Sequence, residues 1–183
     1  RIEEIWNFPK YSAPQKVGNY YFFYKNDGLQ PQSVVWVQEG PGGTPKVFLD
    51  PNTFSSDGTI ALGGIYPSND NKYMAYAVQK SGSDWREFFV MDIATGKKLD
   101  DHIEWAKFAG ASWWKDGFFY SAFDKPAEGT FTSKNEFMKV YYHKLGTQQS
   151  QDELIWEDKT NGKRNHYGGA TEDERFIILY IGE

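Results

Sequence analysis

A polar turn followed by an aromatic-led strand recurs four times in these 183 residues and constrains the fold more than any other feature. The leading aromatics Tyr20, Tyr73, Phe118 and Phe176 are 53, 45 and 58 residues apart. Self-similarity at a long period is the signature of a repeat architecture. The four copies read Gly18-Asn19-Tyr20-Tyr21, Asp70-Asn71-Lys72-Tyr73, Lys115-Asp116-Gly117-Phe118 and Asp173-Glu174-Arg175-Phe176.

Further strands follow within each repeat, while helical periodicity is almost absent. The runs are rich in aromatic and β-branched residues, which favour a pleated sheet, and Gly, Asn, Asp or Pro bound them. We therefore predict an all-β chain. After the leading strand, the first three repeats have a strand near Val34, Phe88 and Val140, and a short final strand at Val47-Phe48-Leu49, around Leu99 and at Leu154-Ile155-Trp156.

Four strands per repeat at a period of about 45–55 residues are typical of propeller blades. A β-sandwich would also place turns every 8–12 residues or so, but it would not repeat at the longer period. The sequence therefore predicts a partial β-propeller of about three and a half blades, each of four antiparallel strands. Because a chain that stops in mid-blade exposes a strand edge, we expect a stretch of a larger propeller.

Composition excludes several classes of partner and site. The formal net charge of −5 argues against a broad electrostatic grip on nucleic acid. The absence of cysteine excludes disulfides, thiolate metal ligands and a cysteine nucleophile. No run approaches about 18 apolar residues, so we predict no membrane span.

The residues that could take part in catalysis or bind a metal are better explained by structural roles. Ser112 lies in Gly110-Ala111-Ser112-Trp113-Trp114, but a nucleophile elbow needs a small residue where Trp114 stands. Acids and a histidine adjoin in Asp100-Asp101-His102, yet strand neighbours point to opposite faces, so we predict a polar turn between strands there rather than a site. The local spacings typical of zinc are missing around His102, His143 and His166, so we expect no metal and no cofactor.

Three aspartates and one short glycine-containing motif are predicted to lie in turns. Asp57, Asp84 and Asp116 lie in Gly-, Ser- or Asn-rich surroundings, where Asp caps the backbone, rather than forming a glycosidase pair. Thr95-Gly96-Lys97 lacks the upstream glycine of a phosphate-binding loop and fits a hairpin turn. We therefore expect a scaffold without a self-contained active site.

Long stretches of the chain resemble one known family. They are VFLDPNTFSSDGTIALGG (Val47–Gly64), YPSNDNKYMAYAVQKSGSDW (Tyr66–Trp85), VMDIATGKKLDD (Val90–Asp101), AKF (Ala106–Phe108), WKDGFFYSAFD (Trp114–Asp124), KVYYHKLGTQQSQDELIWE (Lys139–Glu157) and GGATEDERFIILYI (Gly168–Ile181). These stretches, with WNFPKYSAP (Trp6–Pro14), resemble the N-terminal part of the β-propeller of the prolyl oligopeptidase (prolyl endopeptidase) family. The resemblance implies that residues 1–15 lead into the propeller and that residues 16–183 form incomplete blades of a seven-bladed ring.

The resemblance also implies a function. In that family the propeller caps an α/β-hydrolase domain with a Ser-Asp-His triad, which cleaves short peptides after proline by acyl transfer. None of the triad positions falls in this stretch, so the segment alone is expected to be inactive, with its catalytic domain elsewhere in the parent chain. The expected partners are short proline-containing peptides and that hydrolase domain. The resemblance favours the cytoplasm and leaves the periplasm open.

Two positions carry over from the family's substrate-facing surface. Phe108 matches an aromatic that approaches the peptide side chain beyond the proline pocket. Tyr167 aligns with a position that is usually Met in the same apolar subsite, and Tyr would narrow that subsite or add a hydroxyl. Blade packing is the structural alternative for both residues.

Two other functions stay open on the sequence. The chain could be a stand-alone, propeller-derived peptide- or protein-binding module without enzymatic activity, closing its ring by dimerisation. It could also belong to a related oligopeptidase with basic-residue specificity. The second alternative is less favoured because, apart from Glu104, no marked acidic cluster lies near Phe108 in the sequence.

Overall fold

The structure is a computed structural model that describes residues 1–80, 82–126 and 135–182. These residues form fifteen strands and very little helix, which confirms the prediction of an all-β chain. The short helix α1 (Ile2–Trp6), which the sequence pattern does not predict, buries none of its residues. None of the helices in the described ranges has the length and apolarity that a membrane span requires. The chain divides into two compact units, Arg1–Leu62 and Gly63–Glu183.

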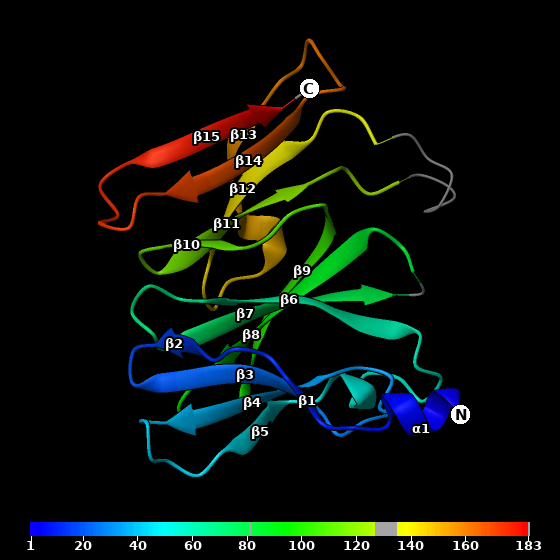
Figure 1. The fold of residues 1–183 in the computed structure, drawn as a ribbon. Coiled ribbons are helices and arrows are strands. Elements are labelled where there is room, and N and C mark those ends of the chain that lie inside the picture. The colour runs from blue at the N-terminus through cyan, green and yellow to red at the C-terminus, as the bar shows by residue number, and fades with distance from the viewer. Residues whose placement is uncertain (81, 127–134, 183) are drawn as a thin grey trace. The chain divides into compact units, whose positions relative to one another are not determined.

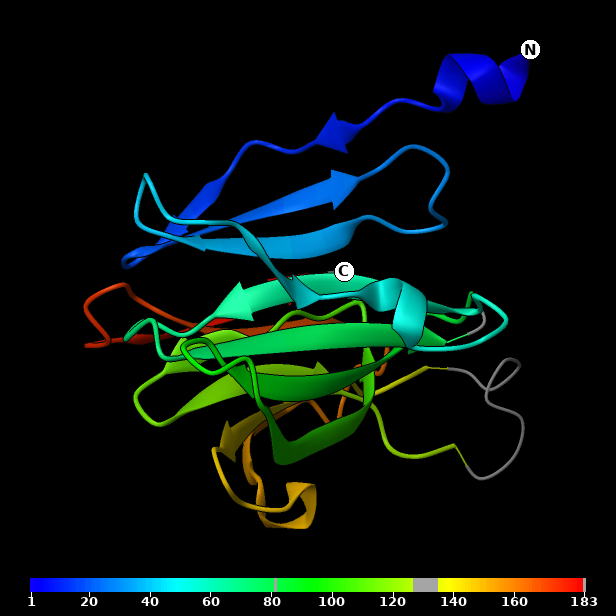
Figure 2. The same cartoon turned by 90° about the horizontal axis from the view of Figure 1, so that it is seen from below.

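The first unit contains one antiparallel sheet in the order β1-β3-β4-β5, with β2 also paired to β3 (Figures 1 and 2). The sheet is followed by the 3-10 turn η1 (Pro51–Thr53). Strands β2 to β5 make one four-stranded blade, as the first repeat predicts. The five strands are β1 (Lys10–Tyr11), β2 (Gln15–Val17), β3 (Tyr20–Asn26), β4 (Val34–Glu39) and β5 (Lys46–Leu49).

The second unit contains two more four-stranded blades and the first two strands of another. One residue pair, Ala106 with Ala122, joins the sheets of these two blades. One blade has β6 (Ile60–Pro67), β7 (Tyr73–Lys80), β8 (Trp85–Asp92) and β9 (Lys98–Lys107). The next has β10 (Ser112–Trp114), β11 (Gly117–Ala122), β12 (Lys139–Lys144), the 3-10 turn η2 (Gln149–Gln151) and β13 (Glu153–Glu157), and it is followed by β14 (Asn165–Ala170) and β15 (Ile177–Gly182).

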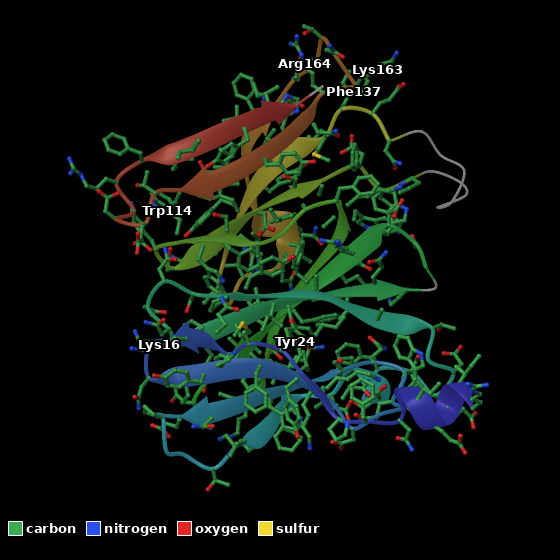
Figure 3. The ribbon with its side chains drawn as sticks, in the orientation of Figure 1. Lys16, Tyr24, Trp114, Phe137, Lys163 and Arg164 are labelled. Carbon is green, nitrogen blue, oxygen red and sulfur yellow. The ribbon has the colours of Figure 1, made fainter. Side chains whose placement is uncertain are left out.

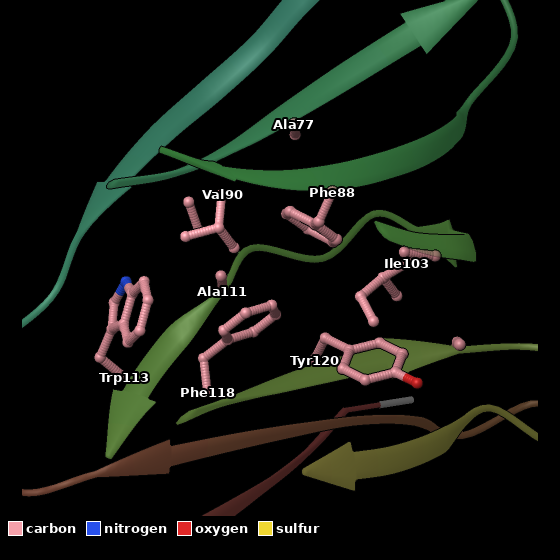
Figure 4. Close-up of a cluster of buried hydrophobic side chains, with 11 residues drawn as sticks. Ala77, Phe88, Val90, Ile103, Ala111, Trp113, Phe118 and Tyr120 are labelled. Atoms are coloured by element: carbon pink, nitrogen blue, oxygen red, sulfur yellow. The ribbon is translucent and has the colours of Figure 1, made fainter. Parts of the chain in front are cut away.

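The aromatic-led strands β7 and β11 have continuous apolar sequences because both of their faces are covered. Every residue of β11 is buried, as is the stretch from Met74 to Val78 in β7. The outer strands β9 and β13 instead alternate between covered and exposed positions. A close-packed layer forms between these two blades (Figure 4), and it includes Ala77, Phe88, Val90, Ile103, Ala111, Trp113, Phe118 and Tyr120.

Two of the four polar turns of the repeat share one hydrogen-bonded design. In the β6–β7 turn, the Ser68 hydroxyl donates to Asp70 Oδ1 at 2.7 Å, and the Lys72 amide donates to the same oxygen at 3.1 Å. These short polar side chains cap the turn backbone. The β14–β15 turn repeats both bonds with Thr171, Asp173 and Arg175.

The turn between the first two strands of each blade also contains a residue whose φ lies in the left-handed region. The conformation reverses the chain tightly, and in β10–β11 it gives a two-residue loop between Trp114 and Gly117. The recurrent polar turn is therefore a conformational requirement of the hairpin. The left-handed residues are Gly18 (φ 58°), Asn71 (60°), Lys115 (49°) and Glu174 (57°).

The Glu174 side chain and backbone connect three of these turns. Its Oε1 accepts from Asn69 Nδ2 at 2.8 Å and from the Lys115 amide at 3.2 Å. Its carbonyl accepts from Trp114 Nε1 at 3.0 Å. The first hairpins of successive blades in the second unit are therefore tied together at one end of their strands.

A buried charged network connects the outer strand β9 of one blade to strand β12 of the next. His143 Nδ1 lies 2.7 Å from Asp152 Oδ1, and His143 Nε2 lies 3.0 Å from Asp101 Oδ1. Since carboxylate oxygens only accept, both ring nitrogens donate and the imidazole is protonated. Tyr120 and the Gly146 amide donate to Asp152 and Asp101.

The carboxylates shift the titration of this histidine. Burial by itself lowers the pKa of His143, but hydrogen bonds to Asp101 and Asp152 outweigh it and raise the pKa to about 9. Burial raises the pKa of Asp101, and its bonds to His143 and Gly146 outweigh this and leave the pKa lowered. The network thus stabilises the fold most fully between the ordinary pKa values of the two groups.

Replacing Gly168 by Ala should destabilise the second unit. A Cβ at this position would lie 2.7 Å from Val140 Cγ1 and 3.1 Å from Phe119 Cβ, so neighbouring strands must move apart. We expect a loss of about 1–2 kcal/mol in the free energy of unfolding, measured as a lower urea midpoint. The matched control is Gly42→Ala, where a Cβ meets nothing within 4 Å and the midpoint should stay nearly constant.

Replacing His143 by Gln should cost about 3–5 kcal/mol of unfolding free energy below pH 6.5, because two buried carboxylates lose their cation. A raised histidine pKa contributes stability that is complete below the ordinary value and is lost as pH rises through about 9. The difference between the two proteins should therefore shrink at alkaline pH in urea titrations. An unchanged difference, or an equal loss in the exposed-site control His102→Gln, would contradict this role.

Candidate substrate-facing site

The strands of the second unit have two chemically different ends. Because strands run antiparallel, connections alternate between ends, so the turns β6–β7, β10–β11 and β14–β15 share one end, here called the turn end. The connections β7–β8, β9–β10 and β13–β14 share the other, here called the loop end. In Figure 1 the β6–β7 and β14–β15 turns lie at the left. Figure 3 places Trp114 at the turn end and Phe137 near Lys163 and Arg164, away from it.

Phe108 lies at the loop end, between β9 and β10. Its side chain is 54% exposed, although its neighbours Lys107 and Ala109 are buried. Its φ of 54° lies in the left-handed region, where a bulky residue is strained. A strained backbone therefore presents an exposed aromatic ring at the position that the resemblance assigns to substrate.

Other aromatic rings surround the base of this loop. The Trp85 ring meets Trp105 edge to face at 5.7 Å between centroids, and it meets Phe123 at 6.2 Å. The ammonium of Lys107 lies 5.0 Å from the Trp85 ring centroid and 5.3 Å from that of Phe108. The Lys107 ammonium therefore links the Phe108 ring to this aromatic cluster.

The non-glycine residues with left-handed φ divide between the two ends. Within the described residues of the chain there are six, and Asn71, Lys115 and Glu174 belong to the hairpins of the turn end. The remaining three are all aromatic, at the loop end or in the chain leading to it: Trp105 (φ 62°), Phe108 (54°) and Phe137 (62°). Turn sterics explain the first set, and Trp105 lies in strand β9 where the register with β8 shifts at a bulge. Phe108 and Phe137 lie in connections between strands, where a strained backbone is a reason to look for function.

Tyr167 is the third residue of β14, close to the loop end. It is half-buried and pairs with Tyr180 of β15. Phe108 follows the last strand of one blade, and Tyr167 lies in the first strand two blades further along the chain. The structure thus brings both residues to the loop end, with no ring contact between them in the part of the chain it describes.

Residues that were predicted to have structural rather than catalytic roles lie in strands and turns. Ser112 lies in strand β10, close to Gly169 of β14. Asp57 and Asp92 cap turns by accepting from Thr59 and Thr95, and these bonds lower the pKa of both carboxyls. Thr95-Gly96-Lys97 forms the predicted turn.

The histidine environments were only partly predictable. The polar turn predicted at Asp100-Asp101-His102 is wrong, because these residues lie inside strand β9, which continues to Lys107. Asp101 and His102 do point to opposite faces, since Asp101 pairs with His143 and His102 pairs with Glu87 at 2.7 Å. No local pattern marks the buried Asp101–His143–Asp152 network, because Asp101 lies 42 residues from His143 along the chain. Its side chains are at most 2% exposed, so substrate cannot reach them.

One group in the described residues could hold a cation. Glu87, His102 and Glu104 offer ligand atoms within 4.8 Å of one another. Lys80 already pairs with Glu87, and His102 and Glu104 are exposed. Paired and exposed carboxylates of this kind are ordinary surface features, so the group adds no chemistry to the site.

Comparison with known proteins identifies the scaffold. The profile of the family described as "Prolyl oligopeptidase, N-terminal beta-propeller domain" matches residues 1–183. The prolyl endopeptidases of Elizabethkingia miricola and Elizabethkingia meningoseptica are 46% and 44% identical over 181 residues. Each match covers 98% of this chain and 26% of the relative. The chain thus spans about a quarter of the length of these curated relatives.

Solved structures of prolyl endopeptidases and prolyl oligopeptidases superpose on this chain. A prolyl endopeptidase superposes with a TM-score of 0.85 at 33% identity, covering 97% of this chain and 25% of the other. Prolyl oligopeptidase B from Galerina marginata, bound to a 35mer hydrolysis and macrocyclization substrate, superposes with a TM-score of 0.84 at 28% identity, covering 97% and 27%. The partial β-propeller predicted from the repeat is therefore confirmed, and the chain belongs to the prolyl oligopeptidase family, matching its N-terminal β-propeller domain.

Proposed function

We propose that this chain is the propeller segment of a serine-type prolyl endopeptidase that hydrolyses short peptides after proline. The segment controls substrate access and lines part of a subsite, while the catalytic triad belongs to an α/β-hydrolase domain of the same parent chain. Residues 1–15 lead into the propeller and residues 16–183 form its blades. The 44–46% identity to two prolyl endopeptidases across 98% of the chain carries the proposal.

Peptides are the substrate class that the comparisons support. Prolyl oligopeptidase B from Galerina marginata is known with peptides of 25 and 35 residues bound. A closed propeller admits only what passes its channel or rim, which selects extended peptides over folded proteins. The chain's own contribution is therefore to choose by size and to contact part of the peptide.

Phe108 is suited to that contact. Its ring is exposed at the loop end while the flanking residues are buried, so the surrounding structure fixes its backbone. A preorganised aromatic loses little conformational entropy when a peptide side chain packs on it. Tyr167, in the first strand of a later blade, narrows the same apolar subsite or offers its hydroxyl to the peptide.

A fluorophosphonate probe on the native protein tests the enzymatic proposal. An antibody against this segment should capture a labelled chain much larger than 21.1 kDa, because the reactive serine lies in a separate domain. An unlabelled native chain near 21.1 kDa would overturn the proposal in favour of a stand-alone binding module. Labelling should be blocked by prior incubation with a proline-containing peptide.

Replacing Phe108 by Ala in the full-length protein should lower kcat/KM by about tenfold for peptides that place a large apolar side chain in the Phe108 subsite, beyond the proline pocket. The loss should appear mainly in KM, since the ring binds substrate without touching the scissile bond. For peptides with Gly at that position, the same substitution should leave kcat/KM nearly unchanged. Phe176→Ala, an exposed Phe next to β15 at the turn end, is the matched control and should leave both constants unchanged.

A further inference from the structure

The backbone on both sides of Phe108 is tied to the beginning of strand β8. Trp85 is the register partner of Lys107, and Arg86 is the partner of Ala106. The Arg86 guanidinium then reaches past Phe108, where its Nη1 donates to the carbonyl of Ala109 at 2.9 Å. One residue of β8 thus holds the chain immediately before and after the exposed ring.

Lys107 contacts the ring itself. Its ammonium lies between the Trp85 and Phe108 rings, 5.0 and 5.3 Å from their centroids, in the range of cation–π attraction. Asp84 Oδ2 lies 3.9 Å from the same nitrogen. The Lys107 side chain is only 11% exposed, so the cation is confined against the two rings rather than free in solvent.

These ties matter because Phe108 has a backbone conformation that it would not adopt unaided. A left-handed φ is unfavourable for a residue with a Cβ, and it persists only where the surroundings determine it. The Ala109 carbonyl is fixed by a charge-assisted hydrogen bond, which is stronger than a neutral one. Without it, the loop can relax toward an ordinary φ and turn the ring away.

We propose that Arg86 and Lys107 are positioning residues that hold the Phe108 ring in place for the substrate. Arg86 acts through the Ala109 carbonyl, and Lys107 acts through the ring faces of Trp85 and Phe108. The proposal rests on the proposed function of Phe108 as a substrate contact and adds the residues that set its specificity.

A double-mutant cycle in the full-length protein tests it. Arg86→Met keeps the length and apolar stem of the side chain but removes the guanidinium. It should raise KM about three- to tenfold for peptides with a large apolar residue at the Phe108 subsite, with kcat within about twofold. In the Phe108→Ala background the same substitution should have no further effect, because the ring it positions is gone. Lys107→Met should behave in the same way.

The outcomes separate the two proposals. If Phe108→Ala leaves KM unchanged, the substrate contact itself is wrong. If Phe108→Ala raises KM but Arg86→Met does not, or raises it equally in both backgrounds, the positioning role is wrong. Arg175→Met, the same change at the turn end, should leave KM and kcat unchanged. Arg86→Lys, which keeps one donor, should recover part of the KM loss and replaces Arg86→Met if that variant does not fold.

Discussion

The packing of one blade's sheet on the next is the interaction on which the second unit depends. Phe88 of one blade lies 6.3 Å from Phe118 of the other, and Tyr73 lies 6.3 Å from Trp113, between ring centroids. Sheets so packed bury both faces of their central strands, which leaves few side chains free along the strands themselves. Chemistry toward a ligand is therefore left to the strand ends, where the loops emerge.

The two ends resolve this constraint differently. At the turn end, short side chains such as Ser68 and Thr171 satisfy the backbone, and Glu174 ties neighbouring hairpins together. At the loop end, backbone strain is concentrated on aromatic residues, and β8 braces Phe108 through Arg86. One end is thus closed by local hydrogen bonds, while the other holds an exposed ring in a fixed position.

The buried Asp101–His143–Asp152 network shows how location decides the role of a residue type. The same side chains form catalytic groups in many hydrolases, but here both histidine nitrogens are occupied by carboxylates and the group is sealed from solvent. A protonated imidazole between two acids links the outer strand of one blade to the next. Its contribution is to stability, and it disappears as the pH rises through about 9.

The sequence alone determined the all-β class, the four-stranded repeat and the polar turns, because these follow from local conformational needs. The leading aromatics lie within one residue of the start of the second strand of each repeat, and Asp70 and Asp173 cap equivalent turns. Phe108 and Tyr167 were named only through the family resemblance, since nothing in a single sequence marks an exposed ring as a ligand contact.

The tertiary structure decided which distant residues meet. Asp101 and His143 are 42 residues apart, and Arg86 and Ala109 are 23 apart, so neither pair has a local signal. The left-handed φ of Phe108 is equally invisible in the sequence, because the residue is strained only by its surroundings. Local chemistry therefore specified the strands and turns, and the register between strands, with the packing between blades, specified the site.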